Sequence, residues 1–185
     1  ANVTTGNENT AIGSYALQAN VTGVSNTAVG SGALFDCTGN SNTALGKSAG
    51  ANITSGGANV AIGYSSLYTS TTQQNNIAIG YQALYSTTTS NNLAIGYNSG
   101  YAVTSGNKNI FVGNYAGEDI TTGANNIGIG YLALEAATTG SDNLCVGKNA
   151  GDNLTTGSFN IVVGSGATAS SATVSNEITL GNSSV

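Results

Sequence analysis

One five-residue pattern recurs from end to end of the chain: Asn, aliphatic, small, aliphatic, Gly, as in Asn76-Ile77-Ala78-Ile79-Gly80. Successive copies are 16 or 17 residues apart. We call the closing residues the anchor glycines; they are Gly13, Gly30, Gly46, Gly63, Gly80, Gly96, Gly113, Gly130, Gly147, Gly164 and Gly181. A constant period of this length is typical of stacked repeats, so we expect one elongated domain built by adding units.

The residues one and three places before each anchor glycine are β-branched or Leu almost throughout, as at Ile77 and Ile79. Strand side chains alternate between faces, so these two columns share a face. We predict that this face forms the core of the rod.

The column between them, two places before each anchor glycine, is small and mostly apolar. Strand alternation then directs it to the outer face, which is usually polar when it meets water. We therefore predict that this column is covered by further copies of the chain, most simply around a threefold axis. The predicted interface residues are Ala11, Ala28, Ala44, Ala61, Ala78, Ala94, Phe111, Cys145 and Val162.

Two other columns predict the packing inside each coil. Asn stands four places before ten of the eleven anchor glycines, with Glu177 as the exception, and stacked Asn side chains can form a hydrogen-bonded ladder. Four places after the anchor the residue is Leu in some coils and Gly in others. Where it is Gly, as at Gly50, an aliphatic residue such as Ile53 follows three places later. One large apolar side chain per coil would thus fill the same space from two alternative positions.

These columns predict an all-β fold, a parallel β-solenoid (β-roll) of about eleven coils of 16–17 residues. A second strand is expected before a Thr-Thr-Gly corner such as Thr121-Thr122-Gly123, which gives two short strands per coil. No apolar pattern has a helical period. We expect regular repeats over residues 1–164 and degenerate terminal coils, acting as a cap or junction, over residues 165–185.

The composition disfavours several kinds of partner. Three Lys, no Arg and a net charge of −5 provide no basic surface for nucleic acid. No run of about 18 apolar residues is present, so we expect no membrane insertion. Cys37 and Cys145 lie six repeats apart, about 29 Å at strand spacing, which is too far for a disulfide within the chain.

The repeat resembles two groups of fibrous proteins. The phrases Ala61-Ile62-Gly63-Tyr64, Asn107-Lys108-Asn109 and Ala78-Ile79-Gly80-Tyr81-Gln82-Ala83-Leu84-Tyr85 resemble the repeat shafts of phage tail-fibre proteins. In those fibres the array ends in a segment similar to residues 175–185, and an endosialidase-type intramolecular chaperone often follows. The pattern is also similar to the β-roll head of trimeric autotransporter adhesins. The resemblance implies a homotrimer that mediates attachment, located outside the cell or on a virion.

Residues suited to catalysis are scarce. The chain has no His, so the commonest general base and zinc ligand is missing. Glu118, Glu135 and Asp152 share one column, which predicts a solvated acidic stripe more readily than a calcium site with six to eight oxygen ligands. We therefore expect a protein that is not an enzyme and that uses no cofactor and no metal.

Tyrosines are concentrated in the fourth to sixth coils and are the candidate binding residues. They occupy two columns, one and five places after the anchor glycines: Tyr64, Tyr81 and Tyr97 in the first, and Tyr68, Tyr85 and Tyr101 in the second. Aromatic side chains with a hydroxyl suit sugars, so a cell-surface glycan is the predicted ligand. The alternative is a stacked ladder that stabilises the solenoid.

The sequence thus favours a structural or adhesive fibre segment, a tail-fibre or adhesin shaft for host or surface attachment. An extracellular filament or matrix protein is the alternative. An ice-binding solenoid is a further one, because Thr or Ser recurs near one corner, although a regular Thr-x-Thr lattice is missing.

Overall fold

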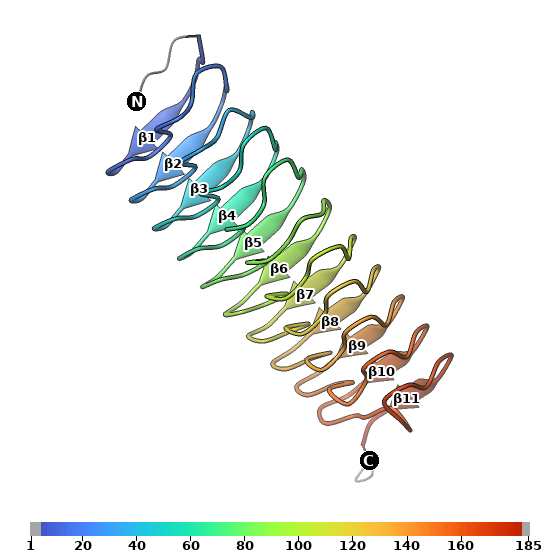
Figure 1. The fold of residues 1–185 in the computed structure, drawn as a ribbon. Helices are drawn as coiled ribbons and strands as arrows, with labels where there is room; N and C mark the ends of the chain where they lie inside the picture. Colours follow the sequence, from blue (N-terminus) through green and yellow to red (C-terminus); the bar gives the residue numbers. More distant parts are fainter. Residues whose placement is uncertain (1–4, 183–185) are drawn as a thin grey trace.

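The computed structural model describes residues 5–182, which form a straight rod of stacked coils (Figure 1). Each coil contributes one three-residue strand to a single parallel sheet in which strand order follows the sequence. The strands are β1 Thr10–Ile12, β2 Thr27–Val29, β3 Thr43–Leu45, β4 Val60–Ile62, β5 Ile77–Ile79, β6 Leu93–Ile95, β7 Ile110–Val112, β8 Ile127–Ile129, β9 Leu144–Val146, β10 Ile161–Val163 and β11 Ile178–Leu180. The predicted all-β parallel solenoid is confirmed. Among the described residues, no helix is long and apolar enough to cross a membrane.

Neighbouring coils are in register at the columns counted from the anchor glycines. Ile77 pairs with Leu93, Ala78 with Ala94 and Ile79 with Ile95. Two periods are one residue short, from Gly30 to Gly46 and from Gly80 to Gly96. In both coils the residue is missing before the same corner. The carbonyls of Gly39 and Thr89 there accept the ladder Asn bond that the glycine of Thr-Thr-Gly accepts in longer coils.

The prediction of two strands per coil is wrong, because each coil has one. The remaining circumference is turns, yet it is also hydrogen-bonded to the next coil, for example from the Leu84 amide to the Ser99 carbonyl at 3.0 Å. Several non-glycine residues in these turns have positive φ, including Gln82 at 51° and Leu84 at 48°. The segment before the Thr-Thr-Gly corner, where the sequence predicts the second strand, is instead closed by turn bonds, such as that from the Ile120 amide to the Gly117 carbonyl at 3.3 Å. Such turns are incompatible with an extended strand.

The Ala column faces the interior, and its two neighbouring columns face outward. Ala78 is fully buried, whereas Ile77 is 38% exposed, and no residue of the two flanking columns is buried in any strand. The predicted core face is therefore wrong. So is the predicted interface, because most of its residues are buried inside a single chain: Ala28, Ala44, Ala61, Ala78, Ala94, Phe111, Cys145 and Val162. Ala11, in β1, is exposed.

The width of the coil explains this reversal. The opposite wall already supplies one large side chain per coil, either Leu as at Leu84 or an aliphatic residue as at Ile53, and both are fully buried. Only a small residue fits between such a side chain and the strand. Where the strand carries the larger Phe111, it faces glycines: a Cβ built on Gly117 would lie 2.5 Å from the Phe111 ring.

The predicted exchange of one large side chain between two positions is confirmed. Leu84 and Gly50 occupy equivalent places and share a left-handed backbone, with φ of 48° and 56°. In the glycine coils the space is taken by the later aliphatic residue, because a Cβ on Gly50 would lie 2.9 Å from Ile53 Cδ1.

The predicted Asn ladder is also confirmed, and it is buried. The Asn92 amide donates to Asn76 Oδ1 at 2.9 Å, and Asn76 Nδ2 donates to the Thr89 carbonyl at 2.8 Å. Equivalent bonds to the side-chain oxygen continue from Asn9 to Asn160, whose Oδ1 accepts from the Glu177 amide at 3.0 Å. Each Asn thus satisfies polar backbone groups of the next coil that would otherwise be buried without partners.

The anchor glycines permit close approach between coils. Gly80 has φ of +141°, and a Cβ there would lie 2.2 Å from the Gly96 carbonyl oxygen. A side chain at this position would force adjacent coils apart.

The coils after residue 164 keep the sheet but change the polar contacts. β11 continues the register of β10, while the Glu177 carboxylate replaces the ladder amide and accepts from the amide and hydroxyl of Ser170 and from the Thr179 hydroxyl. The predicted degenerate segment 165–185 is described as far as residue 182, and its last three residues lie outside the described part.

Candidate functional site

The six predicted tyrosines form two ladders of stacked rings, one per column. In the first ladder, the Tyr81 ring centroid lies 5.2 Å from Tyr64 and 4.9 Å from Tyr97, with interplanar angles of 12° and 6°. In the second, Tyr85 lies 5.2 Å from Tyr68 and 5.3 Å from Tyr101, at 8° and 15°. The spacing is close to that of neighbouring strands. The in-register stacking of coils therefore places these rings face to face.

The two ladders are close to each other. Partial burial raises the pKa of the Tyr85 phenol, and the phenols of its two ladder neighbours and of Tyr64 raise it further. Tyr81 is 41% exposed, whereas Tyr85 is half-buried. The first ladder thus forms the outer row and the second the more protected one.

Stacking decides which part of each tyrosine is available. The ring faces inside a ladder are covered by neighbouring rings, which leaves edges and hydroxyl groups exposed. Sugar recognition by aromatic residues uses the ring face, so this geometry supports the stabilising ladder over the glycan site. Glycan binding by these residues stays a prediction.

Sequence reasoning missed two members of the outer row. Tyr115 lies 5.3 Å from Tyr97, tilted by 59°, and Tyr131 lies 6.1 Å from Tyr115, nearly perpendicular. Tyr131 follows an anchor glycine directly, so its column could have revealed it. Tyr115 stands one position later and meets the row from a left-handed backbone with φ of 61°.

The column of the inner ladder continues as the predicted acidic stripe. Partial burial raises the pKa of Glu135, and the nearby carboxylates of Glu118, Asp119 and Asp152 raise it further. Asn98 Nδ2 donates to Glu118 at 3.0 Å. Within residues 5–182, no three His, Cys, Asp or Glu side chains are placed to hold a metal ion.

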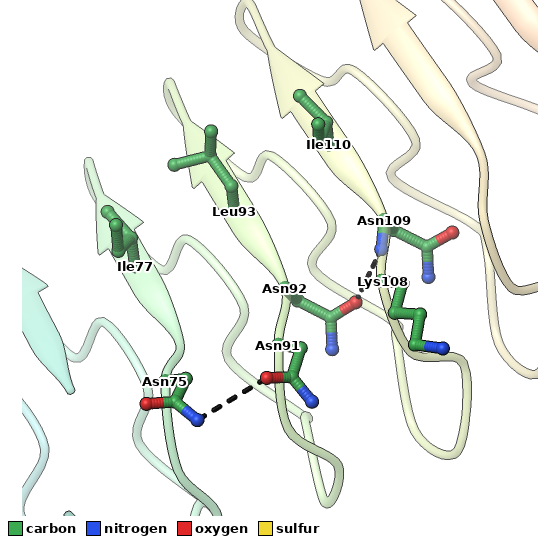
Figure 2. Close-up of a pocket in the computed structure, with 8 residues that line it drawn as sticks. All are labelled: Asn75, Ile77, Asn91, Asn92, Leu93, Lys108, Asn109 and Ile110. Carbon is green, nitrogen blue, oxygen red and sulfur yellow. Dashed lines mark hydrogen bonds between the residues drawn. The ribbon is translucent and has the colours of Figure 1, made fainter. Parts of the chain in front are cut away.

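A shallow groove of about 350 Å³ lies on the outward side of β5, β6 and β7 (Figure 2). Figure 2 shows Ile77, Leu93 and Ile110 on the strands, with Asn91 and Lys108 on the segments that precede them. Asn75 Nδ2 donates to Asn91 Oδ1 at 3.4 Å. The groove belongs to the outward aliphatic columns and has an apolar floor with a polar border.

The outward aliphatic columns form one continuous surface along the sheet. We call them the aliphatic face, made of the first and third residues of β1 to β11. None of these residues is charged, and several are exposed, from 36% at Ile95 to 72% at Leu180. The first column is Thr in β1 to β3 and aliphatic from β4 onward.

The corner threonines form a hydrogen-bonded ladder of their own. Thr104 Oγ1 donates to the Thr121 carbonyl, and Thr121 Oγ1 to the Thr138 carbonyl, both at 3.1 Å. These hydroxyl groups therefore use their proton within the protein, which does not favour an ice-binding surface at this ladder.

No family model matches the sequence, and neither a curated protein nor a solved structure matches it. Function must therefore be argued from the geometry alone.

Proposed function

We propose that this chain is a non-enzymatic structural or adhesive segment of a fibre, assembled side by side from parallel copies, most simply as a homotrimer. The observation that carries the proposal is the aliphatic face. At ordinary strand spacing and rise it measures about 50 Å by 10 Å, or about 500 Å² in projection. A contiguous, uncharged and mostly apolar surface of several hundred Å² is often a site of interaction with another protein.

The shape of the face favours a second copy as the occupant. It is straight, parallel to the rod and periodic at the coil spacing, so an identical rod presents a matching surface at every level. The corrected interface residues are thus the outward strand residues, such as Ile79, Ile95 and Ile129, instead of the buried Ala column. The oligomer predicted from the sequence is retained with a different surface.

Such an assembly suits attachment outside the cell or on a virion. A rod stabilised by repeated local contacts can project a binding end away from a surface, and side-by-side packing stiffens it. Contacts with a surface glycan repeated on several copies would gain strength through avidity.

The mass of the assembly in solution tests the proposal. We expect light scattering and sedimentation to give three chains for the wild type. The double variant Ile95→Asp/Ile129→Asp should give one chain with an unchanged circular dichroism spectrum, because burying two charges on an apolar face is costly. Thr122→Asp, at an exposed corner, is the matched control and should stay trimeric. A monomeric wild type at high concentration would contradict the proposal, and an open-ended polymer would favour the filament alternative.

The adhesive part needs a separate test. Tyr68→Ser/Tyr85→Ser/Tyr101→Ser should lower binding to cells or immobilised glycans if the inner ladder is a binding site. Unchanged binding together with a lower thermal midpoint would assign the ladder to stability alone.

A further inference from the structure

The two tyrosine ladders stack phenol rings of successive coils on the surface of the rod. Four neighbouring pairs are nearly parallel, with centroids 4.9–5.3 Å apart. Each pair joins successive coils of one chain, and Tyr64, Tyr81 and Tyr97 are each about 40% exposed. Because the hydrogen-bonded coils fix this spacing, the rings stay paired without any ligand.

Few other side chains compete for oxidation. The chain contains no Met, Trp or His, and both cysteines are free and fully buried. Burial raises the pKa of the Cys145 thiol to about 12, so its reactive thiolate is scarce. One-electron oxidants that reach this surface therefore meet tyrosines first.

We propose that the ladders are sites of oxidative dityrosine cross-linking between successive coils, with hydrogen peroxide and a haem peroxidase as the oxidising partner. Each of two neighbouring phenols loses one electron and one proton to give a phenoxyl radical. The radicals join through a carbon–carbon bond between ring positions next to the hydroxyl-bearing carbons. The hydrogens on the joined carbons then move to the phenoxyl oxygens, which restores both phenols. One hydrogen peroxide accepts the two electrons and two protons and becomes two waters.

The geometry also selects which tyrosines react together. At 63% exposed, Tyr15 is the most exposed of the described tyrosines. Its aromatic neighbour is Phe35, with the two ring centroids 6.3 Å apart. Phe35 has no phenol and cannot complete the cross-link. If exposure alone decided cross-linking, Tyr15 would react most; if a neighbouring phenol is required, Tyr15 forms no cross-link within the chain.

The consequence is a covalent connection between coils that otherwise hold together by hydrogen bonds and packing. A cross-link between residues one period apart restricts the separation of neighbouring coils in the unfolded chain, as a disulfide does. This inference does not depend on the proposed oligomer, since both rings of each pair belong to one chain.

Treatment of the dilute protein with hydrogen peroxide and a haem peroxidase tests the inference. After digestion with a broad-specificity protease, mass spectrometry should find the pairs Tyr64–Tyr81, Tyr81–Tyr97, Tyr68–Tyr85 and Tyr85–Tyr101, each lighter by two hydrogens. The thermal midpoint of the treated protein should rise.

Matched variants make the result decisive. Tyr81→Phe should remove the Tyr64–Tyr81 and Tyr81–Tyr97 links and keep those of the inner ladder. Tyr85→Phe should remove the Tyr68–Tyr85 and Tyr85–Tyr101 links and keep those of the outer row; Phe keeps the stacking in each case. Tyr15→Phe is the control and should leave the yield unchanged. Cross-links that follow exposure, with Tyr15 dominant, or a dityrosine yield unaffected by Tyr81→Phe combined with Tyr85→Phe, would overturn the inference.

Discussion

At the residue scale, the buried Asn ladder is the most exacting polar feature of the rod. Asn76 connects two coils by accepting from the Asn92 amide and donating to the Thr89 carbonyl. A buried amide or carbonyl left without a partner costs about 1–3 kcal/mol. A single ladder residue therefore affects two coils.

We expect Asn76→Ala to lower the free energy of unfolding by about 2–4 kcal/mol, because it leaves the buried Asn92 amide and the partly buried Thr89 carbonyl unpaired. Denaturant unfolding monitored by circular dichroism measures the loss. Asn75→Gly is the control: Asn75 is exposed, has φ of 58°, and its side chain donates a long hydrogen bond of 3.4 Å to Asn91. It should change stability by less than about 0.5 kcal/mol. Equal losses in the two variants would contradict a special role for the ladder.

Phe159 combines a left-handed backbone, which disfavours a bulky side chain, with an exposed ring. It has φ of 59° and is 60% exposed, while the equivalent place in other coils is often Asn, as at Asn75 and Asn125. The left-handed region costs an ordinary L-residue about 1–2 kcal/mol, and Asn tolerates it better. We expect Phe159→Asn to stabilise the protein by about 1 kcal/mol. Tyr131→Asn, at an exposed position without positive φ, should give no such gain in the same denaturant assay.

At the element scale, the strand pattern predicted the sheet but not its inner face. Alternation shows which residues share a face and leaves open which face is inside. Hydrophobicity was the wrong criterion here, because volume decides in a coil this narrow. The exchange between Leu84 and pairs such as Gly50 with Ile53 already indicated one large side chain per coil. It therefore left no room inside for two aliphatic columns.

The Asn ladder and the tyrosine pairing could be predicted from columns alone, because in-register coils turn sequence position directly into neighbourhood. The missing second strand could not, since its absence depends on local turns such as the one from Gly117 to Ile120, which the strand-favouring Thr residues that follow do not reveal. Tyr115 was missed for a related reason, as it reaches its neighbour from an adjacent column.

The acidic column makes a prediction about pH. The folded chain raises the pKa of Glu135, so it holds that proton more tightly than the unfolded chain does. As pH rises from the ordinary value of about 4.3 through the raised pKa, the free energy of unfolding should fall. Glu135→Gln should lack this fall, so its thermal midpoint should gain on the wild type across that interval and then stay parallel.

Glu177 provides a control of opposite sign. Hydrogen bonds from the Ser170 hydroxyl and amide and from the Thr179 hydroxyl lower its pKa. Its contribution to stability is present above the ordinary pKa and is lost as pH falls through the lowered one. Glu177→Gln should therefore lose stability relative to the wild type at neutral pH. The same sign for both variants would contradict the assignment.

At the scale of the whole molecule, each strand pairs only with the strands before and after it. Stability should then be a sum over neighbouring coils, and one whole period should be removable. Deleting residues 64–80 joins Gly63 to Tyr81 and keeps every column in place. We expect a folded rod shorter by about 4.8 Å, detected by small-angle scattering and circular dichroism. Deleting residues 64–71 instead breaks the register and should abolish the fold; a folded product would contradict the column assignment.

The change from Thr to aliphatic residues on the aliphatic face has a consequence for alignment between copies. If all coils were identical, two copies displaced by one period along the rod would fit almost as well as two copies at equal height. The change from Thr43 to Val60 in the first column breaks this equivalence, so it distinguishes the aligned arrangement from the displaced one. Displacement would place threonine hydroxyls against aliphatic groups, and the penalty would grow with each period of error. In the proposed assembly, this step would favour copies aligned at equal height.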